Sequence, residues 1–187
     1  TNSIILRDKK LQQKIISQTV DFARSHGFSG VVLDLEMSGL PFDSLVDQIV
    51  IFTEDLSKES KAQQLSFDLT LYGDTFYRLR PFDVKRLEPH ADMILLMAYD
   101  FHKSRSNPGP NFPLSGLNAY GYDMGKMADD FLRVVPNKKL TVVFGLFGYD
   151  WTVDANGKAT SQGEPLTLSQ IQKTFLTDCT LRDCTVK

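Results

Sequence analysis

The feature that most constrains the fold is the alternation of helical and strand patterns along the chain. Short runs rich in Val, Leu, Ile and Phe are separated by longer stretches whose apolar residues recur at helical spacing. This pattern predicts strands over 30–36, 65–72, 92–99 and 140–147, and helices over 8–26, 41–60, 82–89, 122–135 and 167–178. Strict alternation favours a parallel sheet with right-handed crossovers. Four such strands fit an open α/β sheet or half of an eight-stranded barrel.

Two stretches interrupt this alternation. Residues 101–118 are rich in Ser, Asn, Pro and Gly and predict a long loop, a class of segment that often carries function. Residues 154–165 are rich in turn formers, and Asn156-Gly157 predicts a hairpin turn. The chain contains no linker, internal repeat or low-complexity segment, so we expect a single domain over 1–187.

Composition narrows the function classes. With 42% hydrophobic and 24% charged residues, the chain is typical of a globular domain, yet its 187 residues fall short of the roughly 250 of a complete barrel. A net charge of −2 does not indicate the excess of basic residues that is typical of nucleic-acid-binding domains. No apolar run approaches the roughly 20 residues of a membrane span. Cys179 and Cys184 are interpreted as unrelated thiols on a helix, with a disulfide or half a metal site as minor alternatives.

The first predicted strand, an apolar run over 30–36, is expected to be buried on both faces, and two carboxylates end it. Asp34 and Glu36 are two residues apart, and side chains at that spacing on a strand point to the same face. The carboxyl ends of parallel strands are where active sites of α/β proteins lie. Desolvating two carboxylates there is costly, so the pair predicts a functional site. The alternative is a solvated pair at a junction between strand and loop.

Further candidates lie at the ends of the other predicted strands. Aromatic side chains at these positions can stack on sugar rings, and they can equally be packing residues of a barrel core. The candidates are Tyr72, Met97, Tyr99, Asp100, Phe147 and Trp151.

Three of these strand ends together resemble one family. Residues 29–36 (SGVVLDLE) are similar to the Asp-Gly-x-Asp-x-Asp-x-Glu signature of family 18 glycoside hydrolases, the chitinase family. Residues 97–100 (MAYD) resemble its Met-x-Tyr-Asp motif, and residues 145–151 (GLFGYDW) resemble its Gly-Leu-Pro-x-Tyr-Gly segment with the following Trp. The resemblance covers about residues 4–155 and implies a (β/α)8 TIM barrel, of which the chain covers roughly strands four to seven with their helices. The four predicted strands are then expected to be parallel neighbours in chain order, with the helices outside.

The chain departs from the family pattern at three positions. Ser29 and Val32 stand where the family usually has its first two Asp residues, and Leu35 stands where Trp or Phe is usual. Because a valine cannot share hydrogen bonds with the carboxylate above it, we expect Asp34 to stay turned toward Glu36. We also expect slower turnover or a shifted pH optimum.

The resemblance implies an enzyme, a glycosidase that cleaves β-1,4-linked N-acetylglucosamine polymers, chitin-like or peptidoglycan-like, by substrate-assisted retaining hydrolysis. It implies that Glu36 protonates the glycosidic oxygen, that Asp34 holds the acetamide, and that Tyr99 and Asp100 fix the acetamido group. Two nearby carboxylates disfavour double ionisation, which raises the pKa of one of them and keeps an acid available near neutrality. The implied substrate-binding residues are Met97, Tyr72, Phe147 and Trp151.

The remaining expectations also follow from the resemblance. No cofactor or metal is implied, the partner is an oligosaccharide or polysaccharide, and the location is outside the cell or in the cell envelope. We expect the carboxylates of Asp34 and Glu36 and the hydroxyl of Tyr99 to converge on one cleft. One alternative is a carbohydrate-binding, weakly active or inactive relative, favoured by the missing aspartates. Another is a hydrolase that uses Asp34, Glu36 and Asp100 to hold Mg²⁺ or Ca²⁺.

Overall fold

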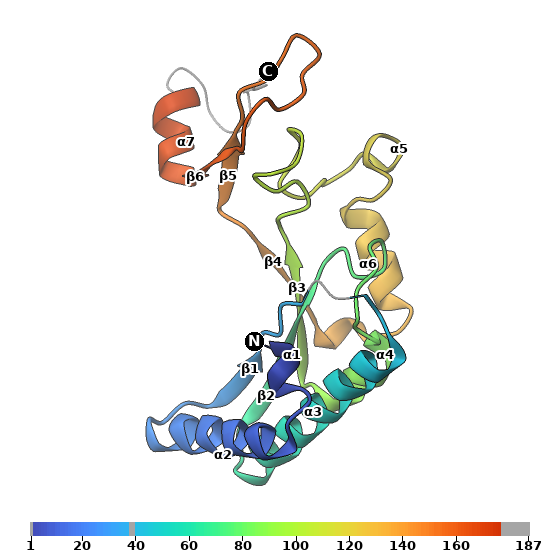
Figure 1. The fold of residues 1–187 in the computed structure, drawn as a ribbon, viewed down its shortest axis with the longest axis vertical. Coiled ribbons are helices and arrows are strands. Elements are labelled where there is room, and N and C mark those ends of the chain that lie inside the picture. Colours follow the sequence, from blue (N-terminus) through green and yellow to red (C-terminus); the bar gives the residue numbers. More distant parts are fainter. Residues whose placement is uncertain (1, 38–39, 177–187) are drawn as a thin grey trace. The chain divides into compact units, whose positions relative to one another are not determined.

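A computed structural model describes residues 2–37 and 40–176 of the chain (Figure 1). The chain divides into two compact units. Unit 1 comprises Thr1–Met97 and Gly125–Val143, and unit 2 comprises Ala98–Met124 and Phe144–Lys187. The single domain expected over the whole chain stays a prediction. Cys179 and Cys184 lie outside the described residues, so their interpretation stays open.

A four-stranded sheet forms the centre of unit 1. Its order is β1 (Gly30–Leu33), β2 (Ser66–Tyr72), β3 (Met93–Ala98) and β4 (Leu140–Phe144). β1 pairs in parallel with β2, and β2 pairs in parallel with β3. The predicted order of the four strands is therefore confirmed.

The helices follow the predicted alternation. In chain order they are α1 (Asn2–Ile5), α2 (Lys9–Ser25), α3 (Asp43–Ala62), α4 (Val84–Leu87) with the 3-10 turn η1 (Glu88–His90), α5 (Leu117–Tyr120), α6 (Met124–Leu132), the 3-10 turn η2 (Asn137–Lys139) and α7 (Leu168–Phe175). α2 starts where the Asp8 carboxylate accepts the free amides of Lys10 and Leu11, and Gly27 follows its end with a φ of +73°. α1, α5 and η2 were not predicted, since such short elements carry too few residues for a periodic signal.

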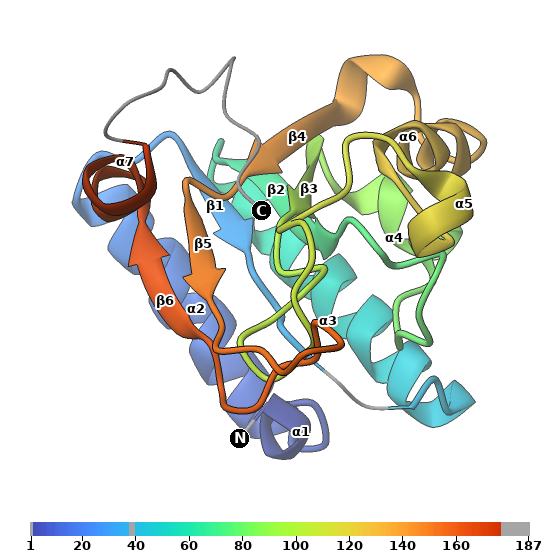
Figure 2. The same ribbon diagram turned by 90° about the horizontal axis from the view of Figure 1, so that it is seen from above.

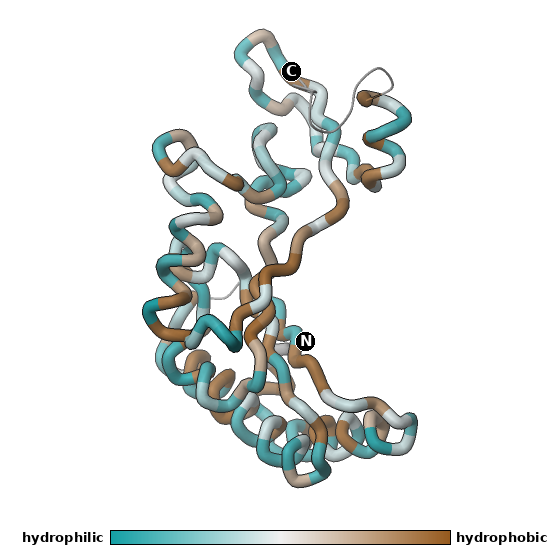
Figure 3. The backbone as a smooth tube through the Cα atoms, turned by 180° about the vertical axis from the view of Figure 1, so that it is seen from behind, coloured by the Kyte–Doolittle hydropathy of each residue, from teal (hydrophilic) through white to brown (hydrophobic). Residues whose placement is uncertain are grey.

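The two faces of β2 differ in burial. Phe67, Leu69 and Leu71 are at most 1% exposed and belong to the core, where α3 packs on the strand (Figure 2). Asp68 and Thr70 alternate with them on the half-buried opposite face. Figure 3 shows the corresponding pattern, with hydrophobic residues gathered on the strands and mixed colours along the helices.

The expectation that residues 30–36 form a strand buried on both faces is wrong in two respects. β1 ends at Leu33, and the side chain of Val32 is 51% exposed. The physical reason for the exposure is that Val32 pairs in register with Asp68 and so lies on the half-buried face of the sheet, opposite the face on which α3 packs. Among the described residues, no helix is long and apolar enough to cross a membrane.

The predicted strand 140–147 is two strands of different sheets. β4 ends at Phe144, and β5 (Phe147–Asp150) pairs antiparallel with β6 (Glu164–Thr167) in unit 2. The break occurs at Gly145, where an added Cβ would meet the Phe147 ring at 2.6 Å. The predicted turn at Asn156-Gly157 is confirmed, since Gly157 has a φ of +74° between the bridged Val153 and Ala159.

Candidate functional site

The carboxylate pair lies on the segment directly after β1, and both side chains are exposed. The register between β1 and β2 pairs Leu33 with Leu69, so the next residue, Asp34, follows beside Thr70. The Thr70 hydroxyl donates to Asp34 Oδ1 at 2.7 Å. The Thr70 hydroxyl also lies 3.3 Å from the carbonyl oxygen of Leu33, and this contact fixes the hydroxyl at the end of β1. The alternation along 65–72 places Thr70 on the same strand face as Tyr72, but nothing in the sequence marked it as a site residue.

Tyr72 continues the same face of β2, two residues beyond Thr70. Burial, together with the charges of Glu36 and Asp34, raises the pKa of Tyr72 to about 12, against a smaller opposing effect of Arg80. The hydroxyl of Tyr72 therefore stays protonated across the pH range in which glycosidases work.

An arginine covers the ring of Tyr72. The Arg80 guanidinium carbon lies 3.8 Å from the centre of that ring. The Nε and Nη2 atoms of Arg80 donate to Asp74 Oδ1 at 3.2 and 2.8 Å, and Asp74 is only 5% exposed. Nothing in the periodicity of the sequence indicated this contact, because it joins a strand end to a turn through side chains alone.

The third strand contributes Met97, which pairs in register with Tyr72 and is 5% exposed. Its burial matches the packing alternative, and its contact with substrate stays a prediction. Deeper along the same face, Val32 pairs in register with Asp68, whose carboxylate accepts the Met93 amide at 3.1 Å. Burial raises the pKa of Asp68.

In unit 2, Asp100 has a left-handed backbone with a φ of +58°, a conformation that Asp tolerates better than most residues. Its amide donates to Asn111 Oδ1 at 2.7 Å, and the Tyr149 hydroxyl donates to its Oδ1 at 2.9 Å. Burial, together with the hydrogen bond and charge of Asp100, raises the pKa of Tyr149 to about 12. Asn111 also donates from Nδ2 to the carbonyl of Phe147 at 3.0 Å. Asn111 therefore joins the loop after β3 to β5, a role that its position inside a predicted loop did not reveal.

Four aromatic rings form a ladder in unit 2. The ring of Tyr99 lies 5.9 Å from that of Phe147, which lies 5.9 Å from Tyr149. Tyr149 in turn lies 5.5 Å from Trp151, whose Nε1 donates to the carbonyl of Ser104 at 3.2 Å. Alternate residues along β5 thus present their rings together, and these edge-on contacts are typical of aromatic packing.

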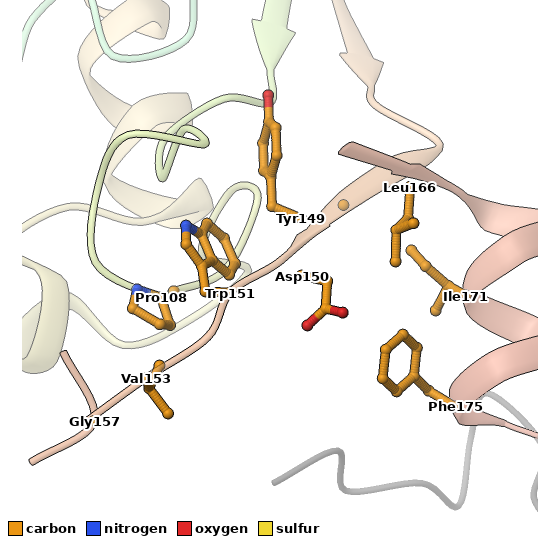
Figure 4. A pocket seen from close by; sticks show the side chains of 11 residues that line it. Pro108, Tyr149, Asp150, Trp151, Val153, Gly157, Leu166, Ile171 and Phe175 are labelled. Atoms are coloured by element: carbon orange, nitrogen blue, oxygen red, sulfur yellow. The ribbon is translucent and has the colours of Figure 1, made fainter. Parts of the chain in front are cut away.

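A pocket of about 530 Å³ opens beside this ladder, within unit 2 (Figure 4). Tyr149 and Trp151 line it from β5 and the segment after it, and Ile171 and Phe175 line it from α7. Asp150 places a carboxylate among these apolar walls. A pocket with apolar walls and one charged group suits a ligand that has both apolar faces and hydroxyl groups, as sugars do.

The predicted site residues divide between the units. Asp34, Glu36, Tyr72 and Met97 lie in unit 1 at the ends of β1, β2 and β3, whereas Tyr99, Asp100, Phe147 and Trp151 lie in unit 2. The roles of these residues and the convergence of Tyr99 with the carboxylate pair stay predictions. In the part of the chain that the structure describes, no three His, Cys, Asp or Glu side chains are arranged to hold a metal ion.

Comparisons with known proteins agree with the resemblance. A family model described as "Glycosyl hydrolases family 18" matches residues 2–182. The Bacillus subtilis protein named "Putative sporulation-specific glycosylase YdhD" is 24% identical over 155 residues, which are 80% of this chain and 34% of that protein. A crystal structure of that glycosylase matches with a TM-score of 0.78 and 19% identity, covering 92% of this chain and 55% of the crystallised one.

A mutant of the family GH18 chitinase from Cycas revoluta, crystallised in complex with (GlcNAc)4, matches with a TM-score of 0.78 and 22% identity. The match covers 94% of this chain and 57% of the crystallised one. The chain thus spans about a third of the length of YdhD and about half of the crystallised chains. These structural matches show the fold, which is part of a (β/α)8 barrel, as predicted. Since the family model covers nearly all of its residues, the chain belongs to glycosyl hydrolases family 18.

Proposed function

We propose that the protein cleaves β-1,4-linked N-acetylglucosamine polymers, chitin-like or peptidoglycan-like, by substrate-assisted retaining hydrolysis. The observation that carries the proposal is the Asp34–Glu36 pair, which lies at the carboxyl end of a parallel strand inside the family signature. The (GlcNAc)4 bound by the Cycas revoluta relative supports the substrate class. Such polymers lie outside the cell or in its envelope, which is where we expect the protein to act.

The first step of the proposed reaction breaks the glycosidic bond. Glu36, the outer carboxyl group, donates its proton to the glycosidic oxygen, and the leaving sugar departs with a free hydroxyl. The carbonyl oxygen of the substrate's own N-acetyl group attacks the anomeric carbon and forms a cyclic oxazolinium ion. Asp34 accepts the acetamide N–H and stabilises the positive charge that develops on the ring. The Thr70 hydroxyl, 2.7 Å from Asp34 Oδ1, limits the orientations open to that carboxylate.

The second step opens the oxazolinium ion. The ionised Glu36 accepts a proton from water, whose oxygen attacks the anomeric carbon from the face that the leaving sugar vacated. The C–O bond of the oxazolinium ion breaks, and the N-acetyl group is restored. Two inversions at one carbon leave the product with the β configuration of the substrate, and Glu36 is protonated again.

Further proposed contacts to the sugar come from the other residues of the family resemblance. Tyr99 and Asp100 hold the acetamido group, and the left-handed Asp100 backbone is kept in place by Asn111. The half-buried rings of Phe147 and Trp151 offer apolar surface to sugar rings. Pre-positioned groups of this kind reduce the entropy lost when the substrate reaches its reactive geometry.

The test separates binding from cleavage. Glu36→Gln keeps the shape of the side chain and removes the proton, so we expect hydrolysis of N-acetylglucosamine oligomers and of peptidoglycan to fall by about 10²–10⁴-fold. Affinity measured by titration calorimetry should stay within a few-fold of the parent. Glu59→Gln, on the exposed surface of α3, is the matched control and should cleave like the parent. If the Glu36→Gln variant hydrolyses as fast as the parent, the assignment of the acid is wrong.

One observation favours a second function, a carbohydrate-binding relative with little or no activity. Val32, 51% exposed, presents an apolar side chain where the family usually has an Asp beneath the central carboxylate. Val32→Asp should raise the rate or shift the pH profile if the parent is an active enzyme. If the parent binds N-acetylglucosamine oligomers and neither the parent nor Val32→Asp cleaves any, the binding function replaces the enzymatic one.

A further inference from the structure

The turn after β2 holds a buried acidic residue that secures two arginines. The Asp74 carboxylate accepts Arg80 through one oxygen and Arg78 Nη1, at 2.9 Å, through the other. The Arg80 side chain is only 11% exposed. Removing a guanidinium and a carboxylate from water is costly, and the cost is offset only when geometry and hydrogen bonds are good. The hydrogen bonds to Asp74 therefore fix the position of Arg80.

In this position the guanidinium of Arg80 lies face-on to the ring of Tyr72. A planar guanidinium can stack on an aromatic ring while its N–H groups bind a carboxylate in the same plane, which the ammonium group of a lysine cannot do. The Phe82 ring, 7% exposed, lies 6.1 Å from the ring of Tyr72 at a tilted angle. With Arg80 and Phe82 both against it, the Tyr72 ring has little freedom to rotate about its side-chain bonds.

The segment after β1 runs past the strand end that carries the phenol. Asp34 lies beside Thr70, as their hydrogen bond shows, and Tyr72 is two residues beyond Thr70 on the same face of β2. Glu36 is two residues beyond Asp34 on the segment that follows β1. The charges of Glu36, Asp34 and Asp74 disfavour ionisation of the phenol, and the charge of Arg80 favours it. A neutral phenol has one O–H to donate, and a carboxylate is the strongest acceptor for it.

We propose that Asp74 and Arg80 clamp Tyr72, and that the clamped hydroxyl acts as the positioning group for Glu36. The hydroxyl donates to the carboxylate of Glu36 when the latter has given up its proton, and it orients that carboxylate toward the anomeric carbon. This inference rests on the proposed function for its catalytic meaning, while the clamp and its contact with Glu36 are testable without any substrate.

The kinetic test uses Tyr72→Phe, which removes the hydroxyl and leaves Asp74 and Arg80 in place. We expect kcat to fall about tenfold with little change in KM, since hydrogen bonds to charged groups are worth about 1.5–3 kcal/mol. The pH at which activity is lost on the alkaline side should rise, because the ionised carboxylate loses a donor. A merely structural role for Tyr72 would not move this limb of the profile.

Arg80→Lys separates position from charge. It keeps the positive charge and loses both the stacking and the forked contact with Asp74, so it should reproduce most of the loss seen in Tyr72→Phe. The two changes combined should cost little more than either one. Arg86→Lys is the matched control, since Arg86 forms an exposed ion pair with Asp47 at 2.7 Å, and it should behave like the parent.

The substrate-free test follows the Tyr72 signal in NMR spectra of protein labelled with ¹³C at tyrosine Cζ, assigned by its loss in Tyr72→Phe. In the parent this signal should shift as the carboxylates titrate between about pH 3 and 7. Glu36→Gln should remove most of the shift, and Arg80→Lys should broaden or reduce it.

The clamp is overturned if Glu36→Gln leaves the Tyr72 titration unchanged, or if Arg80→Lys matches Arg86→Lys in both experiments. If Arg80→Lys does not fold, Tyr72→Phe and Glu36→Gln decide the question alone. A protein that shows the NMR response and cleaves no polymer would refute the proposed function and leave the clamp standing.

Discussion

Thr70→Val perturbs the candidate site with almost no change in shape. Valine has the size of threonine and the same preference for strands, so β2 should keep its packing. The variant loses the Thr70 hydroxyl, which donates to Asp34 Oδ1 at 2.7 Å and holds the Asp34 carboxylate at the end of β1. Asp34 then has more orientations open to it at the moment when it must face the acetamide.

The magnitude follows from the kind of bond and its exposure. A hydrogen bond from a neutral hydroxyl to a carboxylate is worth about 1.5–3 kcal/mol when it is protected from water. Asp34 is exposed, so competition from water reduces this figure, and we take about 1 kcal/mol. If the bond acts on the transition state, kcat falls about fivefold. The free energy of unfolding should change by less than about 1 kcal/mol.

The assay is the steady-state hydrolysis of a fluorogenic N-acetylglucosamine oligomer by Thr70→Val and by Thr70→Ser, which keeps the hydroxyl and should retain most of the activity. A double-mutant cycle with Asp34→Asn in urea unfolding measures the coupling directly, and we expect about 1 kcal/mol or less, but not zero. Equal kcat values for the valine and serine variants, together with zero coupling, would refute the role assigned to Thr70.

Three further predictions concern pH dependence and positioning. Burial raises the pKa of Asp68, so its ionisation weakens the fold as pH rises through the folded-state pKa, and Asp68→Asn should gain stability relative to the parent between acid and neutral pH in thermal unfolding. Burial opposes a low pKa for Asp92, yet the Phe67 amide and Lys61 lower it; Asp92→Asn should therefore be less stable at neutral pH, with a deficit that shrinks as pH falls through the folded-state pKa. These assignments would be contradicted if Asp68→Asn lost stability relative to the parent as pH rises, and if the deficit of Asp92→Asn grew as pH falls. Tyr149→Phe removes the 2.9 Å hydrogen bond to Asp100, and we expect KM for N-acetylglucosamine oligomers to rise several-fold; an unchanged KM would show that Asp100 does not depend on it.

Sequence reasoning succeeded where local pattern decides structure. The alternation of apolar runs and helical spacing predicted the parallel pairing of the strands and the position of α2. Asp34 and Glu36 were expected at the end of the first strand, where the apolar run stops, and they follow β1 directly. These features depend on neighbours within a few residues along the chain.

It failed where the answer lies in contacts between distant segments. The exposure of Val32 follows from its place on the sheet face opposite α3, which no pattern within 30–36 encodes. The separate hairpin that begins at Phe147 pairs with a stretch that reads as turns because of its Gly and Pro residues. Asn111 reaches Phe147, 36 residues away, and Arg80 contacts Asp74 and Tyr72 through its side chain alone, so periodicity carried no signal for either.

The most direct test of the central claim is the configuration of the first product. Proton NMR spectra, recorded within minutes of adding the enzyme to a soluble N-acetylglucosamine oligomer, distinguish the two anomers before they interconvert. Hydrolysis by Glu36 with help from the substrate's acetamido group predicts that the β-anomer appears first and the α-anomer grows in later. Initial release of the α-anomer would mean that water attacks the anomeric carbon directly, and it would contradict the mechanism proposed for Asp34 and Glu36.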